Sequence, residues 1–180
     1  DVPWPTTAAK IAVSSSNAAD TSAGLGVRSV EIHGLSATGA DQDEIIVMNG
    51  TTEVESSLDY VRVNLVHNET VGTYGGSHQG DVTVRVTSAG AKSGNILSVM
   101  EGDEGAVDST VQYGYGEAQN GFTTVPLGKV AYITRIEVIP NVSGNKTVSV
   151  SLYEREDILD VTTPFSPRRV IWSAEEFQDT

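Results

Sequence analysis

The residues in this sequence best suited to catalysis or metal binding are its three histidines. His33, His67 and His78 have neither the H-x-H nor the H-E-x-x-H spacing that would place two imidazoles on one metal ion. His33 falls on the outward side of a predicted strand, His67 at the end of a strand, and His78 in a glycine-rich loop. Each is therefore predicted to be a surface histidine, and the sequence predicts no metal site.

The carboxylates do not form a recognisable catalytic pattern either. Glu101, Asp103, Glu104 and Asp108 form an acidic cluster, for which a solvated loop tip is favoured over a divalent-cation site because EF-hand spacing is missing. The 24 acidic residues could supply a carboxylate pair in almost any fold, so they do not by themselves indicate a glycosidase. The sequence has no G-x-S-x-G motif, no P-loop lysine and no cysteine. We therefore expect no catalytic residues, no cofactor and no enzymatic activity.

The net charge of −13 restricts the partners of the protein. It disfavours nucleic acid, whose phosphates would be repelled, and an anionic membrane surface. No apolar run approaches the roughly 20 residues that span a bilayer. The sequence begins with Asp1 and not with Met, so we expect that residues upstream were removed or omitted.

Alternation of apolar and polar residues is the main structural signal. It predicts strands with one buried and one wet face at Arg28–His33, Val61–Leu65, Val82–Val86 and Val148–Leu152. In the second of these, Val61, Val63 and Leu65 form the predicted inward set. Clean alternation of this kind is typical of antiparallel sheets packed as a sandwich.

Two further strands depart from this pattern. Ile45–Met48 is continuously apolar, which fits a strand that is buried on both faces or that meets a neighbouring subunit. In Ala131–Ile139 the inward parity changes, which predicts a β-bulge near Arg135. Turns are predicted at Asn49-Gly50 and, before the Ala131 strand, at Pro126–Gly128.

Glycine is enriched, at 18 of 180 residues, and turn signals recur between about eight to ten predicted strands. The fold class predicted is all-β, an antiparallel β-sandwich, with a jelly roll as a more specific arrangement that would fit. No change of composition marks a second domain. We expect one sandwich domain over residues 11–160, an N-terminal arm over 1–10 and a C-terminal arm over 161–180.

The two arms are rich in proline and large aromatic residues. Proline lacks the amide donor that a central strand needs. The candidate subunit-contact residues in the arms are Trp4, Pro5, Phe165, Trp172 and Phe177. Aromatic side chains on a stiff backbone are good anchors on another protein surface. The alternative is that both arms fold back onto their own sandwich, and the sequence does not separate the two interpretations.

The order of short motifs along the chain resembles a family of structural proteins of tailed, largely marine bacteriophages. The matching segments are WPTTAAK at Trp4–Lys10, SNAADTSAG at Ser16–Gly24, GVRSVEIHGL at Gly26–Leu35, NGTTEV at Asn49–Val54, VGTYGGSHQGDV at Val71–Val82, GEAQNGFTTVPLGKVAY at Gly116–Tyr132 and TPFSPR at Thr163–Arg168. The chain departs from the family pattern at Leu127 and in Glu101–Val111, which resembles an enlarged loop. The resemblance covers most of the chain and implies a virion structural protein.

This resemblance and the acidic charge lead to a functional expectation. We expect a non-enzymatic virion protein on the exterior of the particle, such as a capsid decoration or cement protein. Its partners would be other copies of itself and other virion proteins such as the major capsid protein. The alternatives are a tail, neck or fibre component, or a carbohydrate-binding β-sandwich that attaches to host-surface glycans. Tyr74, Tyr113 and Tyr115 are the candidate glycan-stacking residues.

Overall fold

The computed structural model describes residues 4–72, 77–87, 94–102, 116–118, 123–136, 148–154 and 169–177. These residues contain strands and no helix, so the all-β prediction is confirmed. The strands are β1 (Ala9–Ser15), β2 (Val27–Leu35), β3 (Asp41–Val47), β4 (Val54–Tyr60), β5 (Arg62–Val71), β6 (Val82–Val86), β7 (Ile96–Met100), β8 (Val148–Glu154) and β9 (Arg169–Phe177).

The chain divides into two compact units, Val2–Lys129 and Val130–Thr180. We call them the N-terminal unit and the C-terminal unit. The single sandwich domain expected over residues 11–160 stays a prediction, and the two units are described separately below. Alternation within each strand did not indicate this division, since it reports the two faces of a strand and not which strands pack together.

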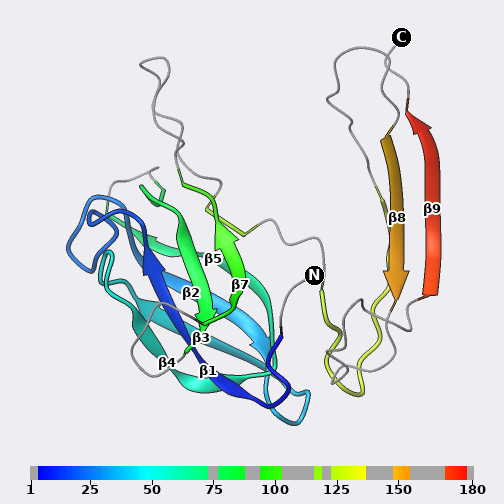
Figure 1. The fold of residues 1–180 in the computed structure, drawn as a ribbon, viewed down its shortest axis with the longest axis horizontal. Helices are drawn as coiled ribbons and strands as arrows, with labels where there is room; N and C mark the ends of the chain where they lie inside the picture. Colours follow the sequence, from blue (N-terminus) through cyan, green and yellow to red (C-terminus); the bar gives the residue numbers. More distant parts are fainter. Residues whose placement is uncertain are drawn as a thin grey trace. The chain divides into compact units, whose positions relative to one another are not determined.

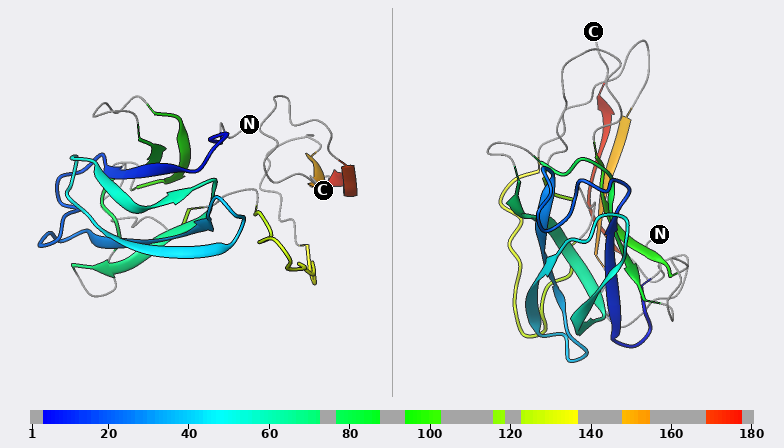
Figure 2. Two further views of the ribbon diagram at one scale, coloured as in Figure 1. Left: turned by 90° about the horizontal axis from the view of Figure 1, so that it is seen from below. Right: turned by 90° about the vertical axis from the view of Figure 1, so that its left-hand side faces the viewer.

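The N-terminal unit is a β-sandwich of two antiparallel sheets. One sheet has the strand order β4-β1-β6-β7 and the other the order β3-β2-β5. Figures 1 and 2 show the two sheets lying face to face. Side chains from both sheets fill the space between them and are almost completely buried: Ile11, Val13, Val30, Ile32, Ile46, Val63, Val66, Val82, Val84 and Leu97. The more specific jelly-roll arrangement stays a prediction.

Strand β3 alternates more regularly than its sequence indicated. Ile46 and Met48 are buried, whereas Ile45 and Val47 each keep 55% of their surface exposed. The expectation of a strand buried on both faces is therefore wrong. Strand β3 lies at the edge of the β3-β2-β5 sheet, and its Ile45 pairs with the outward residue Glu31, so Ile45 and Val47 lie on the outer face. An apolar pair in this position is what the alternative, contact with a neighbouring subunit, would require.

A carboxylate fastens the edge of one sheet to the edge of the other. Glu44 of β3 accepts hydrogen bonds from the amide of Ser57 at 2.6 Å and from the amide of Leu58 at 3.2 Å, both on β4. The Gln42 side-chain amide also donates to the Asp59 carbonyl at 2.8 Å. These bonds hold β3 beside β4 and close that side of the sandwich.

Two predicted turns are present. Gly50 has a φ of 60° and Gly128 a φ of 77°, values that favour glycine because it lacks a Cβ atom. The Lys129 amide donates to the Pro126 carbonyl at 3.0 Å, which closes the predicted turn. The strand predicted to follow it is wrong over residues 131–136, which form no strand, and the bulge expected near Arg135 is not found there. Residues 137–139 lie outside the described residues.

The described strands of the C-terminal unit are β8 and β9, which form an antiparallel two-stranded sheet. The segment 161–180, expected to be an extended arm, therefore contains a nine-residue strand. Strand β9 begins at Arg169, after the prolines of the TPFSPR segment. A start beyond the last proline agrees with the lack of a hydrogen-bond donor at proline.

Candidate functional site

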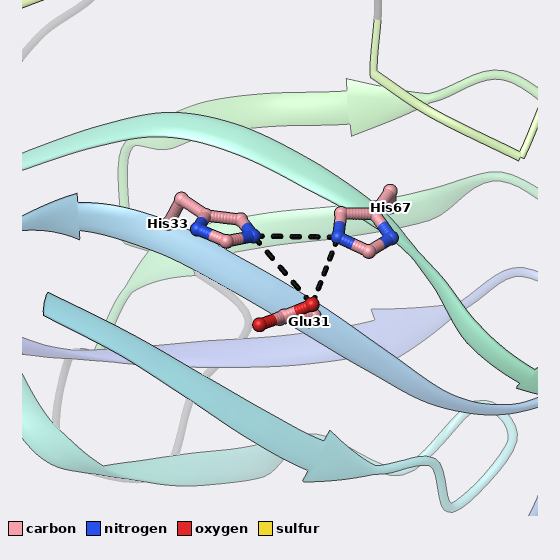
Figure 3. Close-up of side chains that lie close together, drawn as sticks. All are labelled: Glu31, His33 and His67. Carbon is pink, nitrogen blue, oxygen red and sulfur yellow. Dashed lines mark hydrogen bonds and ion pairs between the residues drawn. The ribbon is translucent and has the colours of Figure 1, made fainter.

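Three polar side chains meet on the outward face of the β3-β2-β5 sheet. Strand β2 supplies Glu31 and His33, which alternate with the buried Val30 and Ile32. Side chains at positions i and i+2 of a strand project from the same face. The outward position predicted for His33 is therefore confirmed, and Glu31 lies beside it (Figure 3).

Strand β5 supplies His67 because of a β-bulge. The pairing of β2 with β5 changes register between His33–Leu65 and Gly34–Val63, so Asn64 is an additional residue. Val63 and Val66 are both buried although they are three residues apart, which clean alternation would not allow. The predicted inward position of Leu65 is therefore wrong: Leu65 is half-buried and pairs with the outward residue His33.

The same bulge turns His67 to the outward face, directly opposite Glu31. Asn64 is held by two hydrogen bonds with the backbone of Thr124, one in each direction and each 2.9 Å long. The bulged strand also passes so close to β2 that a Cβ atom on Gly34 would lie 2.2 Å from the Arg62 carbonyl oxygen. Glycine at position 34 therefore permits this close approach.

The three functional groups converge on one point, and we call them the Glu31–His33–His67 cluster. The two Nε2 atoms are 3.3 Å apart, and Glu31 Oε2 lies 3.0 Å from His67 Nε2 and 3.5 Å from His33 Nε2. The imidazole rings are stacked, with centroids 5.4 Å apart and an interplanar angle of 18°. All three side chains are half-buried, so the cluster is supported by the sheet and open to solvent.

Sequence reasoning missed this cluster. The i, i+2 spacing of Glu31 and His33 shows that they share a face, but His67 is 34 residues further along the chain. Its side chain reaches the same face only because of the bulge at Asn64. The sequence has no spacing typical of two imidazoles on one metal ion, yet His33 and His67 are hydrogen-bonding neighbours across β2 and β5.

His78 is completely buried, so the prediction of a surface histidine is wrong. Its Nε2 donates to the Glu101 carbonyl at 2.8 Å, since a carbonyl oxygen can only accept. Its Nδ1 then accepts, with Ser77 Oγ at 3.0 Å and Asn68 Nδ2 at 3.3 Å. The ring is thus hydrogen-bonded at both nitrogens inside the unit, which is a structural role.

Asp20 is a second buried polar group that the sequence did not single out. Its carboxylate is fully buried and accepts hydrogen bonds from the Ser15 hydroxyl at 2.6 Å and from the amides of Val27, Gln79 and Gly80, each at 2.9 Å. These donors belong to three separate segments of the chain. Asp20 therefore connects β1, the start of β2 and the segment that leads into β6.

Tyr60 is a buried phenol beside a carboxylate. It is fully buried at the end of β4, and its hydroxyl donates to Glu44 Oε2 at 3.5 Å. Burial, together with the negative charge of Glu44, raises the pKa of Tyr60 well above its usual value. Asp43 adds a smaller contribution in the same direction.

The predicted contact residues of the arms lie in different environments. Trp4 is 9% exposed and its ring lies under the Arg62 guanidinium, 5.3 Å from the ring centroid, so it packs on its own chain. This agrees with the alternative in which the N-terminal arm folds back. Pro5 next to it is half-buried. In the C-terminal unit Trp172 is half-buried opposite Leu152, and Phe177 pairs with Val148.

The other predicted functional residues fall largely outside the described residues. They are Phe165, the glycan-stacking candidates Tyr74, Tyr113 and Tyr115, and the acidic residues Asp103, Glu104 and Asp108. Glu101 of the acidic cluster is described, and its carbonyl is the acceptor for His78.

Comparisons with protein-family models, curated proteins and solved structures find no match to this chain. Across the residues described here, no helix of membrane-spanning length and hydropathy occurs.

Proposed function

We propose that this chain is a non-enzymatic structural subunit of a phage virion and that it assembles with other protein chains through its C-terminal unit. The observation that carries the proposal is the exposure of apolar side chains throughout the described part of that unit. The order of motifs resembles that of phage structural proteins, and this resemblance is the reason for proposing a phage virion as the particle.

The two described strands of the C-terminal unit are too few to enclose a hydrophobic core. A two-stranded ribbon is marginally stable in water unless another layer covers it. In the sheet described for this unit, β8 and β9 each have the other as their one strand neighbour. Among the described residues each therefore has a second edge, and a further strand from another protein chain would pair with it by the mode of contact called β-augmentation.

The described part of this unit also exposes large apolar side chains. Tyr132 is 85% exposed, Val170 is 51% exposed, and Ile133 and Ile171 are also exposed. Of the side chains described between residues 130 and 173, none is buried. Exposed large apolar side chains are what a protein interaction site requires. A second protein that covered these residues would supply the missing layer.

The charge supports an exterior position on the particle. The chain has 24 acidic and 11 basic residues, so packaged DNA would repel it. Binding to DNA would also release few counterions, and counterion release is what favours protein–DNA binding. An acidic outer surface also keeps particles apart in solution. A capsid decoration or cement protein, bound to the major capsid protein and to further copies of itself, fits both requirements.

The proposal is tested with two double variants of the full chain, Tyr132→Ser with Ile133→Ser and Val170→Ser with Ile171→Ser. Their association is measured by sedimentation velocity and by incorporation into purified virus particles. Burying one large apolar side chain contributes about 1.5–3 kcal/mol, so each double variant should weaken association by about 100-fold or more. Leu25→Ser is the matched control, because Leu25 is a 70% exposed apolar residue of the N-terminal unit.

The outcomes separate assembly from folding. Circular dichroism should show that all variants keep their strands, and Leu25→Ser should assemble like the parent chain. If both double variants enter particles as efficiently as the parent, the C-terminal unit is not the assembly surface. Antibody labelling of intact virions then tests the exterior position, and a signal that appears only after the capsid is opened would contradict it.

A further inference from the structure

We infer that Glu31, His33 and His67 bind one divalent transition-metal ion of the zinc class. Two imidazoles and one carboxylate are a common ligand set for zinc and its transition-metal neighbours. Magnesium and calcium prefer sites made of oxygen ligands, so this set selects against them. The inference concerns a site within the N-terminal unit and is independent of the proposed assembly role.

The distances between the three ligand atoms agree with tetrahedral coordination. Ligand atoms about 2.0–2.2 Å from a tetrahedral zinc ion lie roughly 3.3–3.6 Å from one another. The observed separations are 3.3 Å between the imidazole nitrogens and 3.0 and 3.5 Å from these nitrogens to Glu31 Oε2. An ion can therefore contact all three atoms with only a small adjustment of the Glu31 side chain.

A neighbouring hydrogen bond sets the orientation of one ligand. His67 Nδ1 lies 3.3 Å from the Asn68 carbonyl oxygen, and in this bond Nδ1 must be the donor. A neutral His67 then presents the lone pair of Nε2 to Glu31 Oε2 and His33 Nε2, the arrangement of metal-binding histidines. Without a cation between them, the carboxylate and this lone pair would repel each other unless the ring took a second proton, on Nε2.

The surroundings of the cluster favour a cation and leave one coordination position open. Asp43 lies opposite His33, and Glu117 lies opposite His67. Directly paired residues project from the same face of a sheet, so these carboxylates add negative charge around the cluster. They are not part of the converging group. Because the cluster opens to solvent, the fourth ligand would be water or a donor atom from another molecule.

The experiment uses the full chain after treatment with EDTA. Zinc is titrated by calorimetry and cobalt by visible absorption, since cobalt in a low-coordinate site has characteristic bands. We expect one ion per chain, no competition from excess magnesium, and a rise in the thermal midpoint with zinc concentration. Glu31→Gln, His33→Gln and His67→Gln should each weaken binding by about 100-fold or more, because each removes a ligand that the open site cannot replace.

Asp43→Asn and Glu117→Gln are the controls for charge alone, and they should change affinity by less than about threefold if the cluster is the site. Imidazole NMR resonances of His33 and His67 should shift on zinc binding, whereas those of the buried His78 should not. The inference is overturned if the cluster variants bind zinc as tightly as the parent chain. It is equally overturned if the charge controls lose as much affinity as the cluster variants, or if the His33 and His67 resonances do not respond.

Discussion

Replacing Asp20 should destabilise the N-terminal unit more than any change at the surface of its sandwich. The carboxylate is fully buried and accepts from four different donors, three of them backbone amides. Backbone amides cannot move away or be exchanged for other groups, so they lose their partner if the carboxylate is removed. The size of the effect can be worked out from the individual bonds.

The isosteric variant Asp20→Asn is the most informative change. Its NH2 group must occupy the position of one of the two carboxylate oxygens. At Oδ1 it would face the Val27 and Gln79 amides, whereas at Oδ2 it would face the Gly80 and Gln79 amides and the Ser15 hydroxyl, which can turn to accept. Because the Gln79 amide donates to both oxygens, either placement leaves one other buried amide, Val27 or Gly80, facing a donor without an acceptor.

An unsatisfied buried donor costs about 1–3 kcal/mol, and the bonds that remain lose their charge assistance. We expect Asp20→Asn to lower the free energy of unfolding by about 2–4 kcal/mol and Asp20→Ala by about 3–5 kcal/mol. Ser15→Ala removes one donor and should lower it by about 1 kcal/mol. The order of the three values tests whether the backbone amides, and not the hydroxyl, dominate.

The assay is urea unfolding followed by tryptophan fluorescence. The chain has two tryptophans, and Trp4 belongs to the N-terminal unit while Trp172 belongs to the C-terminal unit. In a Trp172→Phe background the signal therefore reports the N-terminal unit alone. If Asp20→Asn unfolds within about 0.5 kcal/mol of its parent, the carboxylate is not the connection that its hydrogen bonds indicate.

Two further predictions concern Tyr60 and Trp4. Because the pKa of Tyr60 is raised in the folded state, the folded chain holds the phenol proton at a pH where the unfolded chain releases it. The contribution of Tyr60 to the free energy of unfolding is therefore complete below about pH 10. It is lost as the pH rises further, by up to about 1.4 kcal/mol per pH unit. In urea unfolding above about pH 10, the free energy of unfolding should fall less steeply with pH for Tyr60→Phe than for the parent. The exposed control Tyr132→Phe should fall as steeply as the parent. Equal slopes for Tyr60→Phe and the parent would contradict the prediction. Trp4→Ala should lower the free energy of unfolding by about 3–5 kcal/mol, because Trp4 packs under Arg62. A variant that keeps its stability but no longer enters particles would instead identify Trp4 as an assembly anchor.

Local sequence determined the class of fold and several of its details. Alternation has a period of two in any strand with one wet face, so β2 and β6 could be recognised without knowledge of their neighbours. The turns at Gly50 and Gly128 could be recognised for a similar reason, since the ability to adopt a positive φ angle is a property of glycine itself. The antiparallel sandwich followed from these local signals.

Tertiary structure decided where the polar groups meet. The bulge at Asn64 changes the face of His67, and it is held by Thr124, which is 60 residues away in the sequence. His78 is buried and forms hydrogen bonds with Asn68 and Glu101, although its glycine-rich surroundings indicated a surface loop. The separation of the chain after Lys129 likewise depends on which strands pack together. These features arise from pairings between distant segments, whose register and partners a local pattern of apolar and polar residues does not specify.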